Sequence, residues 1–168
     1  MTTAPPRTPL SVRPISADEH LDVVRSRPSV SFLQTPGCAA VKNEWRGESI
    51  GWFDGDRIVG SALVLYRQLP RVKRFLAYLP EGPDIDWRDG DLDRWLAPMA
   101  THLKQQGAFG IRMGPPVVTR RWHAATIKQA IADPVLATLS DVPADVLDDE
   151  ALGVATSLSA LGWKEIPT

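Results

Sequence analysis

The stretch RFLAYLPEGPDIDW, Arg74 to Trp87, most constrains the fold of this chain. Its apolar, aromatic-rich start is typical of a buried strand. The strand must end at Pro80-Glu81-Gly82-Pro83, because proline cannot donate to a sheet ladder and glycine opens backbone angles closed to other residues. A helical pattern from Asp91 to Gly107 follows, and then a second strand, FGIRM, which also stops at a Gly-Pro pair. A strand–helix–strand crossover is right-handed, so we expect two parallel strands whose Gly-Pro exits share one sheet edge, where ligands of α/β proteins usually bind.

Further elements are indicated around this crossover. Ser16-Ala17-Asp18-Glu19 is a capping box that begins a short helix, and Thr35-Pro36 predicts the start of a second one. Asp54-Gly55-Asp56 separates two strand-like runs and indicates a hairpin. A helix is expected over residues 145–161, where apolar residues recur at helical spacing. The fold class is therefore α/β, with a mixed sheet.

Composition narrows the class of protein. Lys and Arg number 19 against 20 Asp and Glu, and the net charge of −1 disfavours a bulk nucleic-acid binder or a polybasic membrane protein. The single cysteine, Cys38, allows neither an intramolecular disulfide nor a cysteine-based zinc site, and we interpret it as a buried structural thiol. The three histidines have no partners at ligand spacing, so no metal site is indicated. A cytoplasmic protein is expected, without a signal peptide or a membrane span.

Five separated segments, in their order along the chain, resemble the Fem-type (FemABX) peptidoglycan bridge aminoacyltransferases. They are SFLQTPGCAAVKNEW, GWFDGDRIVGSALVLYRQLP, RFLAYLPEGPDIDW, HLKQQGAFGIRMGPPVV and the closing LGW. The order of elements is also that of the acetyltransferase-like (GNAT) fold. Because family members resemble tandem pairs of such domains, the resemblance implies the first of two domains, without its last strands. We expect a flexible N-terminus over residues 1–9 and a partial acetyltransferase-like domain over residues 10–168.

The resemblance implies an aminoacyltransferase that moves an amino acid from aminoacyl-tRNA to the stem peptide of a peptidoglycan precursor, UDP-linked or lipid-linked, in cell-wall biosynthesis. Aminoacyl-tRNA is the co-substrate and no cofactor is expected, since PEGP replaces the loop that cradles the pyrophosphate of coenzyme A. A chain without the second domain should show negligible transfer by itself. The alternatives are a non-catalytic precursor-binding module or inactive relic and, more weakly, a coenzyme A-dependent N-acyltransferase. A peripheral contact with the inner membrane surface is left open.

Candidate contacts for phosphate groups lie in three places. Lys42 stands in the VK of the family's motif, and the resemblance implies that it holds the precursor's diphosphate; otherwise it is a solvated helix lysine. A basic patch near Pro70 would meet phosphates of precursor, tRNA or anionic membrane, or would discourage edge-to-edge aggregation; it consists of Arg67, Arg71, Lys73 and Arg74. Arg120 and Arg121 form a second patch beside Trp122, for which a plain surface loop is the alternative.

The first Gly-Pro exit supplies the remaining candidates. Tyr78 at the strand end, with the backbone at Gly82 and Pro83, is expected to line a substrate cleft. Asp86 would accept a proton from the attacking amine, as the catalytic residue, or would only cap the turn that follows. An aminoacyl ester is already activated, so the reaction needs mainly positioning, amine deprotonation and stabilisation of charge at the carbonyl.

Overall fold

The computed structural model describes residues 7–136 and 138–166, and the chain divides into two compact units, residues 1–116 and 117–168. The range 10–168, expected to form one partial domain, spans parts of both units. Most of the expected flexible start, residues 1–9, lies outside the described residues. Within the described part of the chain, no helix is both long enough and apolar enough to cross a membrane.

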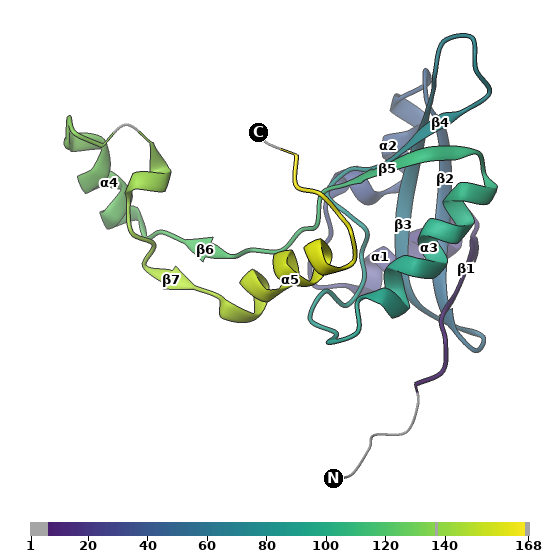
Figure 1. Cartoon of the computed structure of the whole chain (residues 1–168), viewed down its shortest axis with the longest axis horizontal. Coiled ribbons are helices and arrows are strands. Elements are labelled where there is room, and N and C mark those ends of the chain that lie inside the picture. Colours follow the sequence, from purple (N-terminus) through teal and green to yellow (C-terminus); the bar gives the residue numbers. More distant parts are fainter. Residues whose placement is uncertain (1–6, 137, 167–168) are drawn as a thin grey trace. The chain divides into compact units, whose positions relative to one another are not determined.

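A five-stranded mixed sheet forms the frame of the first unit (Figure 1). Its strands follow one another in sequence order, and each neighbouring pair is antiparallel except β4 and β5, which are parallel. The strands are β1 (Ser11–Pro14), β2 (Arg46–Asp54), β3 (Arg57–Gln68), β4 (Phe75–Leu79) and β5 (Ala108–Met113). The parallel pair confirms the predicted crossover, and the hairpin of β2 and β3 confirms the turn at Gly55, whose φ is 62°.

Helices of the first unit cover both faces of this sheet. They are α1 (Ala17–Ser26), α2 (Pro36–Val41) and α3 (Asp93–Gln105), with a 3-10 turn over Phe32–Gln34. The predicted capping box begins α1, since Ser16 Oγ accepts the Glu19 N–H while the Glu19 carboxylate accepts the Ser16 N–H. Pro36 opens α2 as expected. In Figure 1, α3 lies on one face of the sheet and α1 and α2 on the other.

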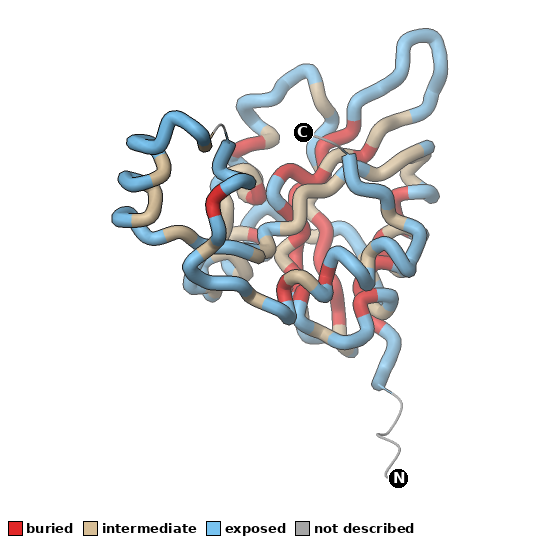
Figure 2. Tube along the Cα trace, turned by 60° about the vertical axis from the view of Figure 1, so that its left-hand side comes forward, coloured by how far each residue is buried: buried red, intermediate tan, exposed pale blue. Residues whose placement is uncertain are grey.

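The core lies on both faces of β2 and β3. On the α3 side the buried Trp52 indole donates a hydrogen bond of 2.7 Å to the Trp95 carbonyl, which ties the sheet to the helix. On the α2 side Cys38 packs against Leu63 and Leu65, so its thiol is buried, as expected. Figure 2 shows buried residues concentrated in the strands of this unit and in α3. This packing fixes the strand ends that carry the candidate site.

The second unit consists of short elements: β6 (Arg120–Arg121), α4 (Ala124–Ala132), a 3-10 turn over Leu139–Asp141, β7 (Val146–Leu147) and α5 (Asp149–Ala160). The helix expected over residues 145–161 therefore starts later than predicted. Val146 and Leu147 pair with β6 as a strand, and the Asp148 carboxylate caps α5 by accepting the Ala151 N–H.

Candidate functional site

The two Gly-Pro exits meet at one edge of the sheet. Leu79, at the end of β4, pairs with Met113 of β5, and the next N–H, that of Gly114, donates to the Leu79 carbonyl at 3.2 Å. A Cβ on Gly114 would lie 3.4 Å from the Glu81 nitrogen, so the exits are in close contact. The prediction that both exits share an edge is confirmed.

Beyond this edge, the segment that follows β4 separates from its neighbour β3 and then pairs with β3 again. Regular pairing of β3 with β4 stops at Leu65 and Tyr78, and an isolated bridge between Ser61 and Asp84 restores it. Two reciprocal backbone hydrogen bonds of 3.0 and 2.9 Å form that bridge. The segment from Pro80 to Pro83 is therefore an anchored bulge of the β3–β4 ladder, which leaves the backbone of Leu63 without a strand partner on that side.

The buried side-chain amide of Gln34 fills the place of the missing strand. Its Oε1 accepts the Leu63 N–H at 3.0 Å, and its Nε2 donates to the Pro80 carbonyl at 2.6 Å and, more weakly, to the Leu63 carbonyl at 3.4 Å. Gly82 packs against this amide, since a Cβ there would lie 2.3 Å from Gln34 Cδ. Glycine is thus required at position 82 by the close approach of Gln34.

Other contacts hold the exit loop in place. The Pro83 carbonyl accepts the buried Trp87 indole N–H at 3.0 Å, and Arg27 Nε donates to the Asp84 carboxylate at 2.8 Å. Glu81 has a φ of 48° and its carboxylate accepts the Ser31 hydroxyl. The loop is therefore fixed by side chains from the residue that follows α1, from the segment before α2 and from its own continuation.

Asp86 is exposed just after this anchored loop. Its Oδ1 accepts the Arg88 N–H at 3.0 Å, which is the turn-capping contact named as the alternative to catalysis. A carboxylate that accepts one backbone hydrogen bond keeps lone pairs for a proton. The role of Asp86 as a proton acceptor therefore stays a prediction.

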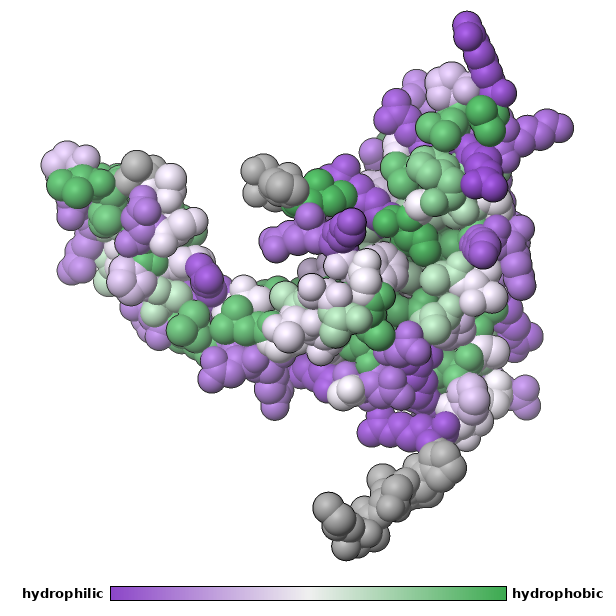
Figure 3. All heavy atoms as spheres, viewed as in Figure 1, coloured by the Kyte–Doolittle hydropathy of each residue, from purple (hydrophilic) through white to green (hydrophobic). Residues whose placement is uncertain are grey.

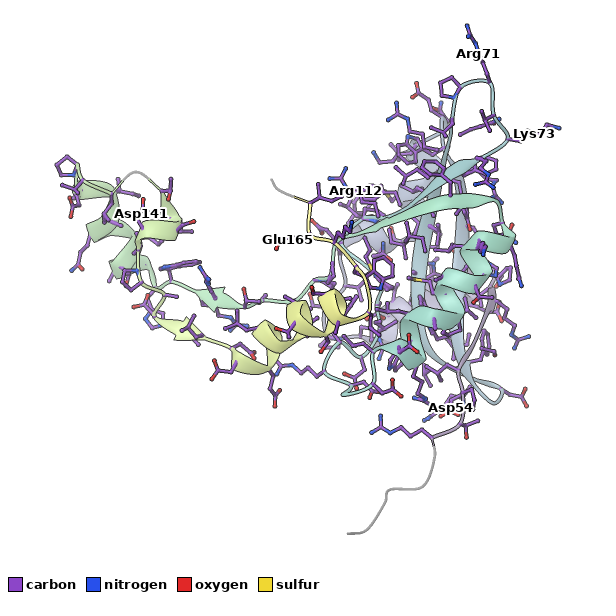
Figure 4. The ribbon with its side chains drawn as sticks, viewed as in Figure 1. Asp54, Arg71, Lys73, Arg112, Asp141 and Glu165 are labelled. Carbon is purple, nitrogen blue, oxygen red and sulfur yellow. The ribbon has the colours of Figure 1, made fainter. Side chains whose placement is uncertain are left out.

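An aromatic pair with two arginines lies on the α2 side of the sheet, just before the exits. The rings of Trp45 and Tyr78 have centroids 6.1 Å apart, tilted by 51°. The Arg67 guanidinium carbon lies 5.7 Å from the Trp45 ring, and that of Arg112 lies 5.8 Å from the Tyr78 ring. These four residues, called the Trp45–Tyr78 patch below, place two positive charges beside two aromatic faces. Figure 4 labels Arg112 at the end of β5.

Lys42 belongs to the same neighbourhood. It is exposed at the C-terminal end of α2, where its carbonyl accepts the Trp45 N–H at 3.0 Å. The helix ends at Val41, and the turn from Lys42 to Trp45 brings the indole against Tyr78 and the Cys38 cluster. Of the candidates from the sequence, Arg67 and Tyr78 thus lie beside Trp45, and Lys42 lies in the turn that leads to it.

The other predicted phosphate contacts lie elsewhere. Arg74 is exposed directly before β4, at the opposite end of that strand from the exits. Arg120 and Arg121 are exposed on β6 of the second unit, where the neighbouring Trp122 indole donates to the Val142 carbonyl at 3.0 Å. That contact anchors Trp122 within its own unit.

Three residues of the site were missed by sequence reasoning: Gln34, Trp45 and Arg112. For Arg112 a signal existed, because alternation along β5 and the parallel register with β4 place it opposite Tyr78. For Gln34 none existed, since a lone buried amide follows no period.

Buried titratable groups lie away from the exits. The Tyr66 hydroxyl donates to the Glu48 carboxylate, whose other oxygen lies 3.3 Å from His102 Nε2. Burial and this carboxylate raise the pKa of Tyr66 far above its usual range, so the phenol stays protonated. Burial also lowers the pKa of His20, whose Nδ1 lies 2.8 Å from Ser49 Oγ. Among the described residues, no group of three His, Cys, Asp or Glu is arranged to hold a metal ion.

Comparisons with known proteins agree with this fold. A family model described as the FemAB family matches residues 15–143. The crystal structure of FemX superposes with a TM-score of 0.61 at 22% identity, over 92% of this chain and 32% of the FemX chain. This chain therefore spans about a third of the length of FemX. No curated protein matches the sequence.

Two acetyltransferase structures also match, at lower similarity. An aminoglycoside acetyltransferase from an uncultured soil metagenomic sample, in complex with sisomicin, has a TM-score of 0.46 at 13% identity, over 95% of this chain and 93% of its own. A possible acetyltransferase from Clostridium difficile 630 has a TM-score of 0.40 at 11% identity, over 84% of this chain and 100% of its own. The expected mixed α/β, acetyltransferase-like fold is confirmed.

Proposed function

Because the chain belongs to the FemAB family, we propose that it is part of an aminoacyltransferase that moves an amino acid from aminoacyl-tRNA to the stem peptide of a peptidoglycan precursor in cell-wall biosynthesis. The observation that carries this proposal is the position of the Trp45–Tyr78 patch beside the joined Gly-Pro exits, all within the matched residues 15–143. The proposed partners are aminoacyl-tRNA and a UDP-linked or lipid-linked muropeptide. The buried free thiol of Cys38 agrees with a reducing cytoplasm.

Charge and aromatic surface together suit the precursor's nucleotide- or lipid-linked diphosphate. We assign the diphosphate to Lys42, Arg67 and Arg112, because a point charge and two planar guanidiniums can bind several phosphate oxygens at once. The Trp45 and Tyr78 rings would pack against a sugar or base. Glu44 shares the turn with Lys42, so the local charge is positive without being uniformly so.

The exit loop would position the acceptor amine. In the proposed reaction the amine nitrogen bonds to the ester carbonyl carbon, the ester C–O bond breaks, and the ribose hydroxyl leaves with the proton that the amine gives up. Asp86 would accept that proton first, while Gly82 and Pro83 form the anchored wall behind it. Since the ester is activated, holding the two substrates in register supplies most of the rate.

Two features support aminoacyl-tRNA over coenzyme A as the co-substrate. The Glu81 carboxylate stands in the exit loop, where it would repel a pyrophosphate. In addition, β4 and β5 stay hydrogen-bonded to each other as far as Gly114, so no gap opens between their ends for a pantetheine arm. Acetyl-CoA should therefore leave the melting temperature of the chain unchanged.

Titration of the chain with a UDP-linked muropeptide tests the proposal. A charge-assisted hydrogen bond contributes about 1.5–3 kcal/mol, so Lys42→Ala should raise Kd by about 10- to 100-fold. The matched control is Lys104→Ala, which removes an exposed lysine from α3 on the opposite face and should leave Kd unchanged. Equal loss in both variants, or no binding by the unmodified chain, would refute the assignment.

A transfer assay with aminoacyl-tRNA then separates the enzyme from a binding module. We expect negligible transfer by this chain alone, because a site for two substrates in this family is expected to need a second domain. Addition of a chain that supplies such a domain should restore transfer, and Asp86→Asn should abolish it again. Muropeptide binding that never leads to transfer, with any added domain, would support the non-catalytic module instead.

A further inference from the structure

The connection between β3 and β4 forms a projecting hairpin tip, Leu69 to Arg74, at the top of the first unit in Figure 1. The Leu69 N–H donates to the Arg74 carbonyl at 2.9 Å, which closes the base of the tip. Inside it, the Val72 N–H reaches the Leu69 carbonyl at 3.4 Å. The tip therefore has a defined shape, although none of its side chains is buried.

The tip carries several positive charges close together, although the whole chain has a net charge of −1. Arg71, Lys73 and Arg74 lie within it, Arg67 precedes it on β3, and the sequence from Arg57 to Pro80 has no acidic residue. No ion pair neutralises these four side chains among the residues that the structure describes. Figure 4 shows Arg71 and Lys73 extending outward from the loop.

Two apolar side chains stand among these cations. Leu69 is 40% exposed and Val72 is 49% exposed, and Figure 3 shows hydrophobic surface next to the hydrophilic atoms of this region. Exposure of aliphatic side chains to water is unfavourable, and the phosphates of an RNA backbone offer these side chains no apolar surface to pack against. A lipid interface does, because headgroup phosphates take the cations while the acyl boundary takes the aliphatic groups.

The apex of the turn carries an arginine where glycine would be easier to accommodate. Pro70 and Arg71 are the central residues of the turn, and Arg71 has a φ of 66°, in the left-handed region that glycine prefers. A long cation held there at a cost in backbone strain indicates a use for its charge at the tip.

From these observations we infer that the Leu69–Arg74 tip docks on an anionic lipid bilayer, with Arg71, Lys73 and Arg74 against the headgroups and Leu69 and Val72 in the interface. The strand β4 runs from this tip to the Gly-Pro exit, so the exit lies at its opposite end, about 16 Å away for five residues. Docking would therefore leave the exit free. This inference concerns binding to lipid and does not depend on the transfer reaction.

Flotation of the full 168-residue chain with phosphatidylcholine vesicles, with or without a quarter of phosphatidylglycerol, tests the inference. The chain should float only with the anionic vesicles, and rising salt should release it. Arg71→Ala should weaken partitioning about fivefold, the effect expected for one basic residue near such a surface. The matched control is Arg57→Ala, which removes an exposed arginine from the other end of β3 and should have no effect.

A second variant separates binding from folding. Arg71→Gly relieves the left-handed backbone, so it should raise the melting temperature while it weakens vesicle binding as much as Arg71→Ala does. The double variant Leu69→Ser and Val72→Ser keeps every charge and should still lose partitioning by about tenfold or more.

Three results would overturn the inference. The first is equal flotation with neutral and anionic vesicles. The second is equal loss in the Arg57 control and the tip variants. The third is weaker binding to tRNA in the tip variants with unchanged vesicle binding, which would make the tip an RNA contact.

Discussion

The contact between Gln34 and Gly82 predicts a strong coupling between two residues 48 positions apart in sequence. Gln34→Ala removes the buried partners of the Leu63 N–H and the Pro80 carbonyl. Each buried polar group left without a partner costs about 1–3 kcal/mol, so the free energy of unfolding should fall by about 2–6 kcal/mol. This is a large share of the stability of a domain of this size, about 5–15 kcal/mol.

Gly82→Ala should destabilise the chain for a different reason. The added Cβ would lie 2.3 Å from Gln34 Cδ, 2.4 Å from its Oε1 and 2.7 Å from its Nε2, so the amide must move and its hydrogen bonds must weaken. Overpacking of this kind costs about 1–3 kcal/mol. All three clashing atoms are absent when position 34 is alanine. The double variant should therefore be little less stable than Gln34→Ala alone, with a coupling energy of about 1–3 kcal/mol.

Urea unfolding followed by tryptophan fluorescence measures this cycle. Four of the six tryptophans, at positions 45, 52, 87 and 95, lie in the first unit, so the signal reports mainly on it. The controls are Gln105→Ala, at an exposed position of α3, and Gly90→Ala, where an added Cβ meets open space. Both controls should change stability by less than about 0.5 kcal/mol. If the two substitutions at 34 and 82 are additive within about 0.5 kcal/mol, the amide does not fill the gap in the ladder as described.

Two further predictions concern buried titratable groups. Burial lowers the pKa of His20 below its value in the unfolded chain, so the unfolded state binds more protons. The free energy of unfolding should therefore decrease as the pH falls below about 6.5. If the urea midpoint falls equally between pH 7 and 5.5 in the wild type and in His20→Gln, the prediction is wrong. Tyr66→Phe removes the hydroxyl that donates to Glu48, and it should lower the free energy of unfolding by about 1–3 kcal/mol, measured in urea, whereas a neutral effect would mean that the carboxylate finds water instead.

Local signals in the sequence predicted the frame of the first unit correctly. The capping box at Ser16 and Glu19, the turn at Gly55 and the parallel strands that end in Gly-Pro pairs all depend on residues close in sequence or on one chirality rule. The predicted start of the last helix, at residue 145, was wrong. Val146 and Leu147 fit a helical pattern as well as a strand, and only their pairing with β6 decides between the two.

The candidate site was predictable only in part. Arg67 and Tyr78 both lie beside Trp45, and Lys42 belongs to the turn that leads to Trp45. Gln34 and Trp45 act through tertiary contacts. The Gln34 amide takes the place of a missing strand, and the Trp45 indole is brought against Tyr78 by a turn. Contacts of this kind depend on the packed structure, and a periodic pattern carries no information about them.

The hydrogen bond between Gly114 and Leu79 has a mechanical consequence. It joins two segments that lie 35 residues apart in sequence, and the close approach of Gly114 to Glu81 leaves little slack between them. A force that displaces one Gly-Pro segment should therefore pull the other with it. This coupling is direct and does not depend on α3, the helix that connects their strands in sequence. The two Gly-Pro segments should therefore move together, so that a ligand that displaces one of them also displaces the other.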